Sequence, residues 1–217
     1  MRNIVFYILA SFSSLLVLFY CLTLTSISRG AGESFAVFLL PLSTHFSWDR
    51  ASVASIYSIY MVCLGFGSLL SGLSFDKYGP RFNYMLGLGL LSIAYGLLGS
   101  FSSIWQFYAF LGILGGLGAS MVGVIPAQSL VSRWFDKNLG IALSIAYAGQ
   151  GLGVLIMAPL SQISIDHFGW QLSYKYISYV FIALLIFVSF LPWKKISSGS
   201  KTTQEKQKTE ELWGVFH

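Results

Sequence analysis

The sequence predicts an all-α, polytopic membrane protein with six transmembrane helices arranged as two inverted three-helix repeats. Its composition, the spacing of its charged residues and an internal repeat predict this fold class. Of the 217 residues, 55% are hydrophobic and 10% are charged, whereas a soluble domain carries about 25% charged residues. The 13 basic and 8 acidic residues are too few to cover the surface of a globule of this size. A soluble enzyme is therefore excluded.

The charged residues leave long stretches of the chain uncharged. These stretches lie between Arg2 and Arg29, Arg50 and Asp76, Arg81 and Arg133, Lys137 and Asp166, and Lys175 and Lys194. A helix that crosses a bilayer needs about 20 predominantly apolar residues, and the third stretch is long enough for two such helices. The predicted spans lie near 16–44, 51–71, 82–101, 104–131, 139–164 and 173–192.

Basic residues set the predicted orientation, because they collect on the cytoplasmic side of a membrane protein. Arg29 is considered separately below, and Arg50 and Lys175 fall on one side of the six spans. The other side holds Arg2, Lys77, Arg81, Arg133, Lys137, Lys194, Lys195, Lys201, Lys206 and Lys208. We therefore expect a multi-pass protein of the plasma (inner) membrane with both termini in the cytoplasm. The net charge of +5 reflects this orientation and indicates no nucleic-acid partner.

The predicted domains follow from the spans. Residues 1–196 form a six-helix transmembrane bundle, and residues 197–217, rich in Ser, Thr, Gln, Lys and Glu, form a cytoplasmic tail or a truncated central linker.

Two parts of the chain resemble each other at an offset that drifts from 85 to 90 residues. Pro41 corresponds to Pro126, Asp49 to Asp136, and Asp76 to Asp166. The offset covers three predicted helices, and because three is odd, the second copy crosses the membrane in the opposite sense to the first. Inverted repeats of this kind are typical of secondary transporters, whose sites lie near the membrane midplane between the repeats.

The loop after the second span contains Gly72, Asp76, Lys77, Gly79 and Arg81. We expect the first glycine to let two helices approach closely and the aspartate to accept hydrogen bonds from a helix N-terminus or a basic side chain. The second glycine and the proline after it favour a tight turn. This spacing resembles the cytoplasmic loop signature of the major facilitator superfamily, whose members have twelve spans in two six-helix halves. The resemblance implies that the loop is a gate that latches the halves in the outward-open state, and that this chain is the amino-terminal half.

Further segments resemble the monocarboxylate and oxalate–formate transporter branch of that superfamily. They are Arg133–Phe135, Gly140–Ala142, Ala148–Gly153, Pro159–Leu160, Phe168–Trp170 and Val37–Pro41. In that branch the basic residue that pairs with the carboxylate of the substrate generally lies in the half that this chain does not contain.

Arg29 and Glu33 are the candidate site charges. The repeat register extends the first span to about residue 44, which places this pair near mid-membrane, four residues apart on one helix face. A charge at the bilayer centre costs roughly 2.5–3.5 kcal/mol, so both side chains should be paired and face an aqueous cavity. One interpretation is a cavity pair that binds an anionic substrate through Arg29 or exchanges a proton through Glu33. The other is a structural ion pair that holds the first span against its neighbours.

Other polar side chains could line the same cavity. They are Tyr57, Tyr60, Gln128, Tyr147 and Gln150. Each could instead form an ordinary hydrogen bond between helices.

Small residues indicate where helices pack. Gly112, Gly116, Ala119 and Gly123 lie on one face of the fourth span, and Gly149 and Gly153 lie on the fifth. Such faces allow close approach of helices in lipid. The glycines match no nucleotide-binding pattern, and no Cys, His and carboxylate cluster has metal-ligand spacing. We therefore expect no enzyme activity, no catalytic residue, no metal and no cofactor.

Together these observations predict a secondary active transporter, an antiporter or symporter that works by alternating access. The solute is a small molecule, and an organic anion such as a carboxylate is the leading hypothesis. The expected partners are the lipid bilayer, the solute, and either a second six-helix half or a second copy of the chain. The alternative is a non-transporting partner subunit or a truncated remnant of such a transporter.

Overall fold

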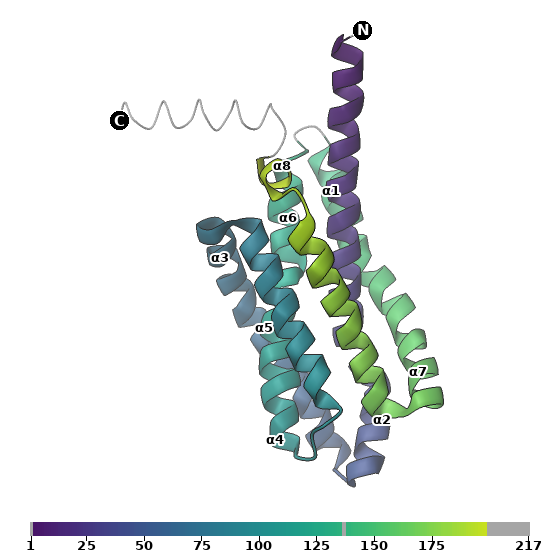
Figure 1. Ribbon diagram of the computed structural model, residues 1–217. Coiled ribbons are helices and arrows are strands. Elements are labelled where there is room, and N and C mark those ends of the chain that lie inside the picture. Colours follow the sequence, from purple (N-terminus) through teal and green to yellow (C-terminus); the bar gives the residue numbers. More distant parts are fainter. Residues whose placement is uncertain (1, 136–137, 199–217) are drawn as a thin grey trace.

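The computed structural model describes residues 2–135 and 138–198 of the chain (Figure 1). Asp136, Lys137 and residues 199–217 lie outside the described residues. They include four of the basic residues assigned to the cytoplasmic side, which are Lys137, Lys201, Lys206 and Lys208. Within the described part, the chain is all-helical and contains no strand. This agrees with the predicted all-α class.

Four helical segments among the described residues are long and apolar enough to cross a membrane. They are Ser14–Phe46, Arg50–Leu98, Ile104–Ser132 and Leu139–Phe190. The second and fourth contain 49 and 52 residues, more than twice the length that one crossing requires. The chain is therefore a multi-pass membrane protein.

The first segment comprises α1 (Arg2–Glu33) and α2 (Phe35–Phe46), separated only at Ser34. The backbone of Ser34 stays in the helical region, with φ −64° and ψ −9°, and its N–H donates to the carbonyl of Gly30. The helical path therefore continues past Arg29 and Glu33. This agrees with the repeat register, which extends the first span to about residue 44.

The second segment is α3 (Arg50–Leu98). Asp49 caps its start, because the Asp49 side chain accepts a hydrogen bond from the N–H of Ala51. Its helical path is broken at Gly79, where φ is 82° and ψ is 170°. Beyond the break, the amide of Asn83 donates to the hydroxyl of Ser71 across 3.1 Å. In a straight helix these residues would lie about 18 Å apart, so α3 folds back on itself.

The fourth segment, α7 (Leu139–Phe190), repeats this arrangement at Gly169, with φ 78° and ψ 165°. The hydroxyl of Ser173 donates to that of Ser164 across 2.8 Å, although nine residues of straight helix would separate them by about 14 Å. Figure 1 shows the turn of α3 near the end of the bundle where α8 lies and the turn of α7 at the opposite end.

Both helices extend several residues beyond the predicted ends at 71 and 164 because each stops only at its glycine turn. The residues between, including Asp76 and Lys77, are compatible with a helix. Apolar content therefore locates a membrane span, but the turn residue decides where its helix ends.

The third segment consists of four pieces. They are α4 (Ile104–Phe107), the π-helix η1 (Tyr108–Gly115), α5 (Gly116–Val122) and α6 (Val124–Ser132). It begins with a capping box between Ser103 and Gln106 and changes direction at Gly123, where φ is −76° and ψ is −145°.

The predicted small-residue faces lie at helix contacts. A Cβ on Gly153 of α7 would collide with the carbonyl oxygen of Ser26 on α1, and a Cβ on Gly149 would lie 2.7 Å from the carbonyl oxygen of Leu22. On the third segment, a Cβ on Gly116 would lie 2.6 Å from the carbonyl oxygen of Tyr60 on α3. The absent side chains let these backbones touch, as expected for packing in lipid.

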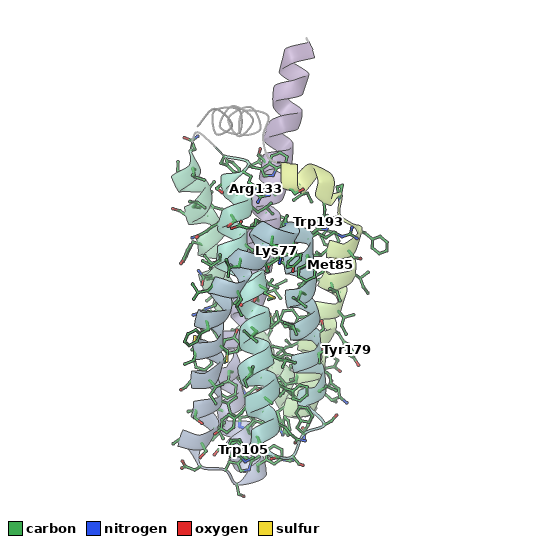
Figure 2. All side chains as sticks on the ribbon, turned by 90° about the vertical axis from the view of Figure 1, so that its left-hand side faces the viewer. Lys77, Met85, Trp105, Arg133, Tyr179 and Trp193 are labelled. Atoms are coloured by element: carbon green, nitrogen blue, oxygen red, sulfur yellow. The ribbon has the colours of Figure 1, made fainter. Side chains whose placement is uncertain are left out.

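The last described helix is α8 (Trp193–Ser198). Two side chains at the end of the third segment hold its carbonyl groups: Trp134 donates to the carbonyl of Ile196 (2.8 Å) and Arg133 to that of Ser197 (3.3 Å). The predicted domain boundary between residues 196 and 197 thus falls inside a short helix. Figure 2 shows Arg133, Trp193 and Lys77 toward one end of the molecule and Trp105 at the other.

Candidate functional site

A cavity of about 290 Å³ lies between α1, α3, α5, α6 and α7. It is bordered by Thr25, Ser28, Arg29, Leu64, Ser68, Ala119, Ser120, Gly123, Val124, Ile125, Gln128, Tyr147 and Gln150. Four of the predicted site residues, which are Arg29, Gln128, Tyr147 and Gln150, are brought together here from three helices. On the side of α7 the cavity is bordered by Gln150 and by Tyr147, which is 52% exposed.

Arg29 is the one charged side chain among the described residues that border the cavity. Its Nη2 atom lies 2.7 Å from Oε1 of Glu33, and the two side chains are 31% and 26% exposed. The pairing relieves much of the cost of placing either charge within the membrane. Because a guanidinium has five N–H donors and one carboxylate cannot use them all, Arg29 can still donate toward the cavity.

Tyr57 joins this pair from α3. Its hydroxyl donates to Oε2 of Glu33 across 2.5 Å, so a chain of contacts runs from Tyr57 through Glu33 to Arg29. Neither Tyr57 nor Glu33 borders the cavity itself. The structure therefore places them behind Arg29, as its supports.

Tyr60 does not line the cavity, contrary to the sequence-based expectation. It is 2% exposed, and its hydroxyl lies against the backbone of Gly32 on α1. The side chain is thus part of the packed core between α1 and α3. Residues three positions apart on a helix lie on similar faces but point in slightly different directions. Here Tyr57 contacts Glu33 beside the site, whereas Tyr60 points into the core.

Sequence reasoning missed the small hydroxyl side chains of the cavity. Thr25 and Ser28 share the face of Arg29 through i, i+3, i+4 spacing, a pattern that could have identified them. Ser68 and Ser120 border the cavity from different helices. Gly67 lets Ser120 approach α3, because a Cβ on Gly67 would lie 2.5 Å from the Ser120 hydroxyl. No local pattern reveals such a contact.

The predicted gate loop lies at the turn of α3, away from the cavity. Gly79 adopts the left-handed conformation that the tight turn requires, as expected. Asp76, Lys77 and Arg81 are exposed, and Lys77 lies 5.2 Å from the ring centroid of Tyr78.

One expectation about this loop, the close helix approach at Gly72, is wrong in the described structure. A Cβ on Gly72 would meet only Ile125, at 4.0 Å, so this glycine does not enable a close helix contact. Asp76 forms no ion pair or side-chain hydrogen bond with any other described residue, so its expected hydrogen bonds stay a prediction. Its carboxylate faces solvent.

Comparisons with known proteins match this arrangement to one family. The model of the Major Facilitator Superfamily matches residues 18–216. An uncharacterized MFS-type transporter, YcxA, from Bacillus subtilis is 31% identical over 154 residues, which cover 71% of this chain and 38% of the relative. Monocarboxylate transporter 12 of Mus musculus is 33% identical over 156 residues, which cover 70% of this chain and 31% of the relative. Monocarboxylate transporter 1 of Homo sapiens is 30% identical over 143 residues, which cover 65% of this chain and 28% of the relative.

The matched region spans less than two fifths of the length of each of these relatives. The family match nevertheless covers most of the chain, including every helix that borders the cavity. The relatives are transporters by name, not enzymes. This chain, with its apolar helices folded around a membrane cavity, belongs to the major facilitator superfamily.

Proposed function

We propose that the chain is the amino-terminal half of a secondary active transporter that moves a small organic anion, such as a carboxylate, by alternating access. The observation that carries this proposal is the cavity in which Arg29 is the one bordering charge. A guanidinium in a partly dry site binds a carboxylate through strong, directional hydrogen bonds. The similarity to proteins named monocarboxylate transporters supports the same class of solute.

We propose that the chain crosses the membrane six times as an inverted repeat. Gly79 and Gly169 are 90 residues apart and have nearly the same backbone angles. The hydroxyl of Ser74 donates to Asn83 across the first turn, and that of Ser173 donates to Ser164 across the second. These two pairs also correspond at an offset of 90 residues. The repeated turns, at opposite ends of the bundle in Figure 1, support two copies of a three-helix unit inserted in opposite senses.

The bound anion would share Arg29 with Glu33. When the anion enters, its carboxylate competes with Glu33 for the guanidinium, and Glu33 then carries an unbalanced negative charge. Uptake of a proton by Glu33 would relieve that imbalance, which would couple anion movement to proton movement. The remaining polar groups, Gln128, Tyr147 and Gln150, would orient the rest of the solute.

A site between two halves needs a second half, and we propose that the side of the cavity bordered by exposed Tyr147 faces it. That half is either a second six-helix bundle or a second copy of this chain, placed parallel to the first. In this assembly, the exposed loop residues Asp76, Lys77 and Arg81 would form the gate. The second half would supply the hydrogen-bond donors or the basic side chain that pair with Asp76. The proposed orientation places both termini and this loop on the cytoplasmic side of the plasma membrane.

The alternative is a partner subunit or remnant that transports nothing by itself. It differs from the first function in a testable respect, because a site between two halves is incomplete when one half is alone.

Uptake into liposomes separates these functions. The purified chain is reconstituted, and uptake of radiolabelled formate, acetate, pyruvate and lactate is measured with and without an inward proton gradient. We expect Arg29→Gln to lower uptake at least about tenfold, the loss expected for one charge-assisted contact. Arg50→Gln, an exposed arginine at the start of α3, is the matched control and should retain uptake. A folded wild-type chain that takes up none of these anions would favour the non-transporting alternative.

A further inference from the structure

The two carboxylate oxygens of Glu33 have different partners. Oε1 lies 2.7 Å from Nη2 of Arg29, whereas Oε2 accepts the hydroxyl proton of Tyr57 across 2.5 Å. Only Arg29 of these three side chains borders the cavity. Tyr57 and Arg29 therefore share one carboxylate, and Glu33 links Tyr57 to the side chain that borders the cavity.

The ring of Tyr57 stacks on two other aromatic rings. It stacks on Phe35, the first residue of α2, with centroids 5.9 Å apart and planes 6° apart. It also stacks on Tyr60, with centroids 5.8 Å apart and planes 15° apart. These contacts fix where the hydroxyl points, and a phenylalanine at position 57 would keep them. The hydroxyl can therefore be removed without removing the stack.

A hydrogen bond to Oε2 limits how strongly Glu33 can hold Arg29. A carboxylate with both oxygens available tends to pair with a guanidinium through two parallel hydrogen bonds. Here Oε2 already accepts a hydrogen bond from a neutral donor that is itself fixed in place, and this bond holds the carboxylate in the orientation that presents Oε1 to Arg29. The guanidinium is thus held firmly enough to be stable in the membrane, while N–H donors remain free for the cavity.

We propose that Tyr57 is a positioning residue: its hydroxyl holds Oε2 of Glu33 and thereby keeps Arg29 available to a carboxylate in the cavity. Without the hydroxyl, Glu33 turns both oxygens to Arg29 and draws the guanidinium away from the cavity. The part of this inference that concerns anion binding rests on the proposed function. The part that concerns the Arg29–Glu33 pair does not.

Chemical modification of arginine tests the pair directly. Phenylglyoxal reacts with guanidinium groups, and mass spectrometry of the detergent-purified chain gives the rate at each arginine, with exposed Arg50 as the internal reference. Tyr57→Phe should lower the rate at Arg29 relative to Arg50, because Arg29 becomes more tightly paired. If Tyr57 merely stabilised the fold, its loss would loosen the region and raise the rate. A raised or unchanged rate overturns the proposal.

A double variant tests whether the effect passes through Glu33. Glu33→Gln should raise the modification rate at Arg29, because the counter-charge is lost. Tyr57→Phe/Glu33→Gln should then have the rate of Glu33→Gln alone. A double variant that differs from Glu33→Gln would show that Tyr57 acts by another route. Tyr174→Phe, which removes a buried hydroxyl on the second arm of α7, is the control and should leave the rate at Arg29 unchanged.

Transport kinetics test the consequence for binding. In liposomes, Tyr57→Phe should raise the KM for monocarboxylate uptake about tenfold and leave Vmax unchanged. A fall in Vmax at constant KM would contradict a positioning role. If the wild-type chain takes up no monocarboxylate, the proposed function fails, while the arginine modification rates still decide whether Tyr57 controls the Arg29–Glu33 pair.

Discussion

Two tyrosine hydroxyls one helical turn apart on α3 have opposite surroundings. Tyr57 donates to Glu33, whereas the buried hydroxyl of Tyr60 has no hydrogen-bond partner among the described residues. A buried hydroxyl without a partner destabilises a protein by about 1–3 kcal/mol relative to one that is satisfied. At the residue scale, the hydroxyl of Tyr57 therefore holds Glu33 beside the site, whereas the hydroxyl of Tyr60 forms no hydrogen bond with a described residue.

This difference predicts the effect of removing the hydroxyl of Tyr60. We expect Tyr60→Phe to keep or raise the free energy of unfolding, by up to about 1 kcal/mol, because an unsatisfied polar group is lost and the ring remains. Tyr108→Phe is the matched control: its hydroxyl contacts Ser55 and donates to the carbonyl of Ser52, so its loss should destabilise by about 1 kcal/mol. Thermal unfolding in detergent measures both. Equal destabilisation by the two variants would mean that the hydroxyl of Tyr60 is satisfied.

At the element scale, the contact between α1 and α7 depends on glycine. Gly149 and Gly153 let the backbone of α1 approach α7 more closely than any side chain would permit. The hydroxyl of Thr25 donates to the carbonyl of Ala146 across the same contact, at 3.2 Å. This contact positions Arg29 beside Tyr147 and Gln150 at the cavity, so the packing of two helices determines the composition of the site.

Two glycines on α7 provide a matched test of this contact. Gly153→Ala should destabilise the bundle, because the new Cβ would collide with the carbonyl oxygen of Ser26 and force the helices apart. Gly151→Ala, with no atom within 4 Å of the new Cβ, should stabilise it by up to about 1 kcal/mol through helix propensity. The melting temperatures in detergent should therefore shift in opposite directions. A Gly153→Ala variant as stable as Gly151→Ala would contradict the close approach of α1 and α7.

At the scale of the whole molecule, the labelled basic residues gather toward one end of the bundle, whereas tryptophans lie toward both. Lys77, Arg133 and Trp193 lie toward one end and Trp105 lies at the other (Figure 2). Basic residues favour the cytoplasmic side, and tryptophan is common at membrane–water interfaces. The distribution of these side chains is consistent with the proposed orientation.

Cysteine labelling measures the orientation. In a background without Cys21 and Cys63, a membrane-impermeant thiol reagent added to intact cells should modify a cysteine placed at Ser102. A cysteine placed at Ser132 should react only after the cells are permeabilised, because it lies at the end of α6, next to Arg133. Both positions are exposed in the structure, so burial cannot explain a difference. Labelling of the Ser132 position in intact cells would reverse the orientation.

The sequence by itself determined the membrane class, the helical content, the register of the first span and the turn at Gly79. These properties depend on local chemistry: a bilayer requires long apolar stretches, backbone groups in lipid must pair within helices, and a glycine followed by proline stops a helix. The pairing of Arg29 with Glu33 is also local, because the two residues are four apart on one helix.

Only the tertiary structure decided which polar side chains meet. Tyr57 and Tyr60 have the same type and nearly the same helical face, yet one supports Arg29 and the other packs against Gly32. Ser68 and Ser120 reach the same cavity from different helices, and Gly72 turned out to have room for a side chain. Such outcomes depend on how helices cross and how closely they approach. Crossing and approach are set by side chains far apart in the chain, so no local pattern contains them.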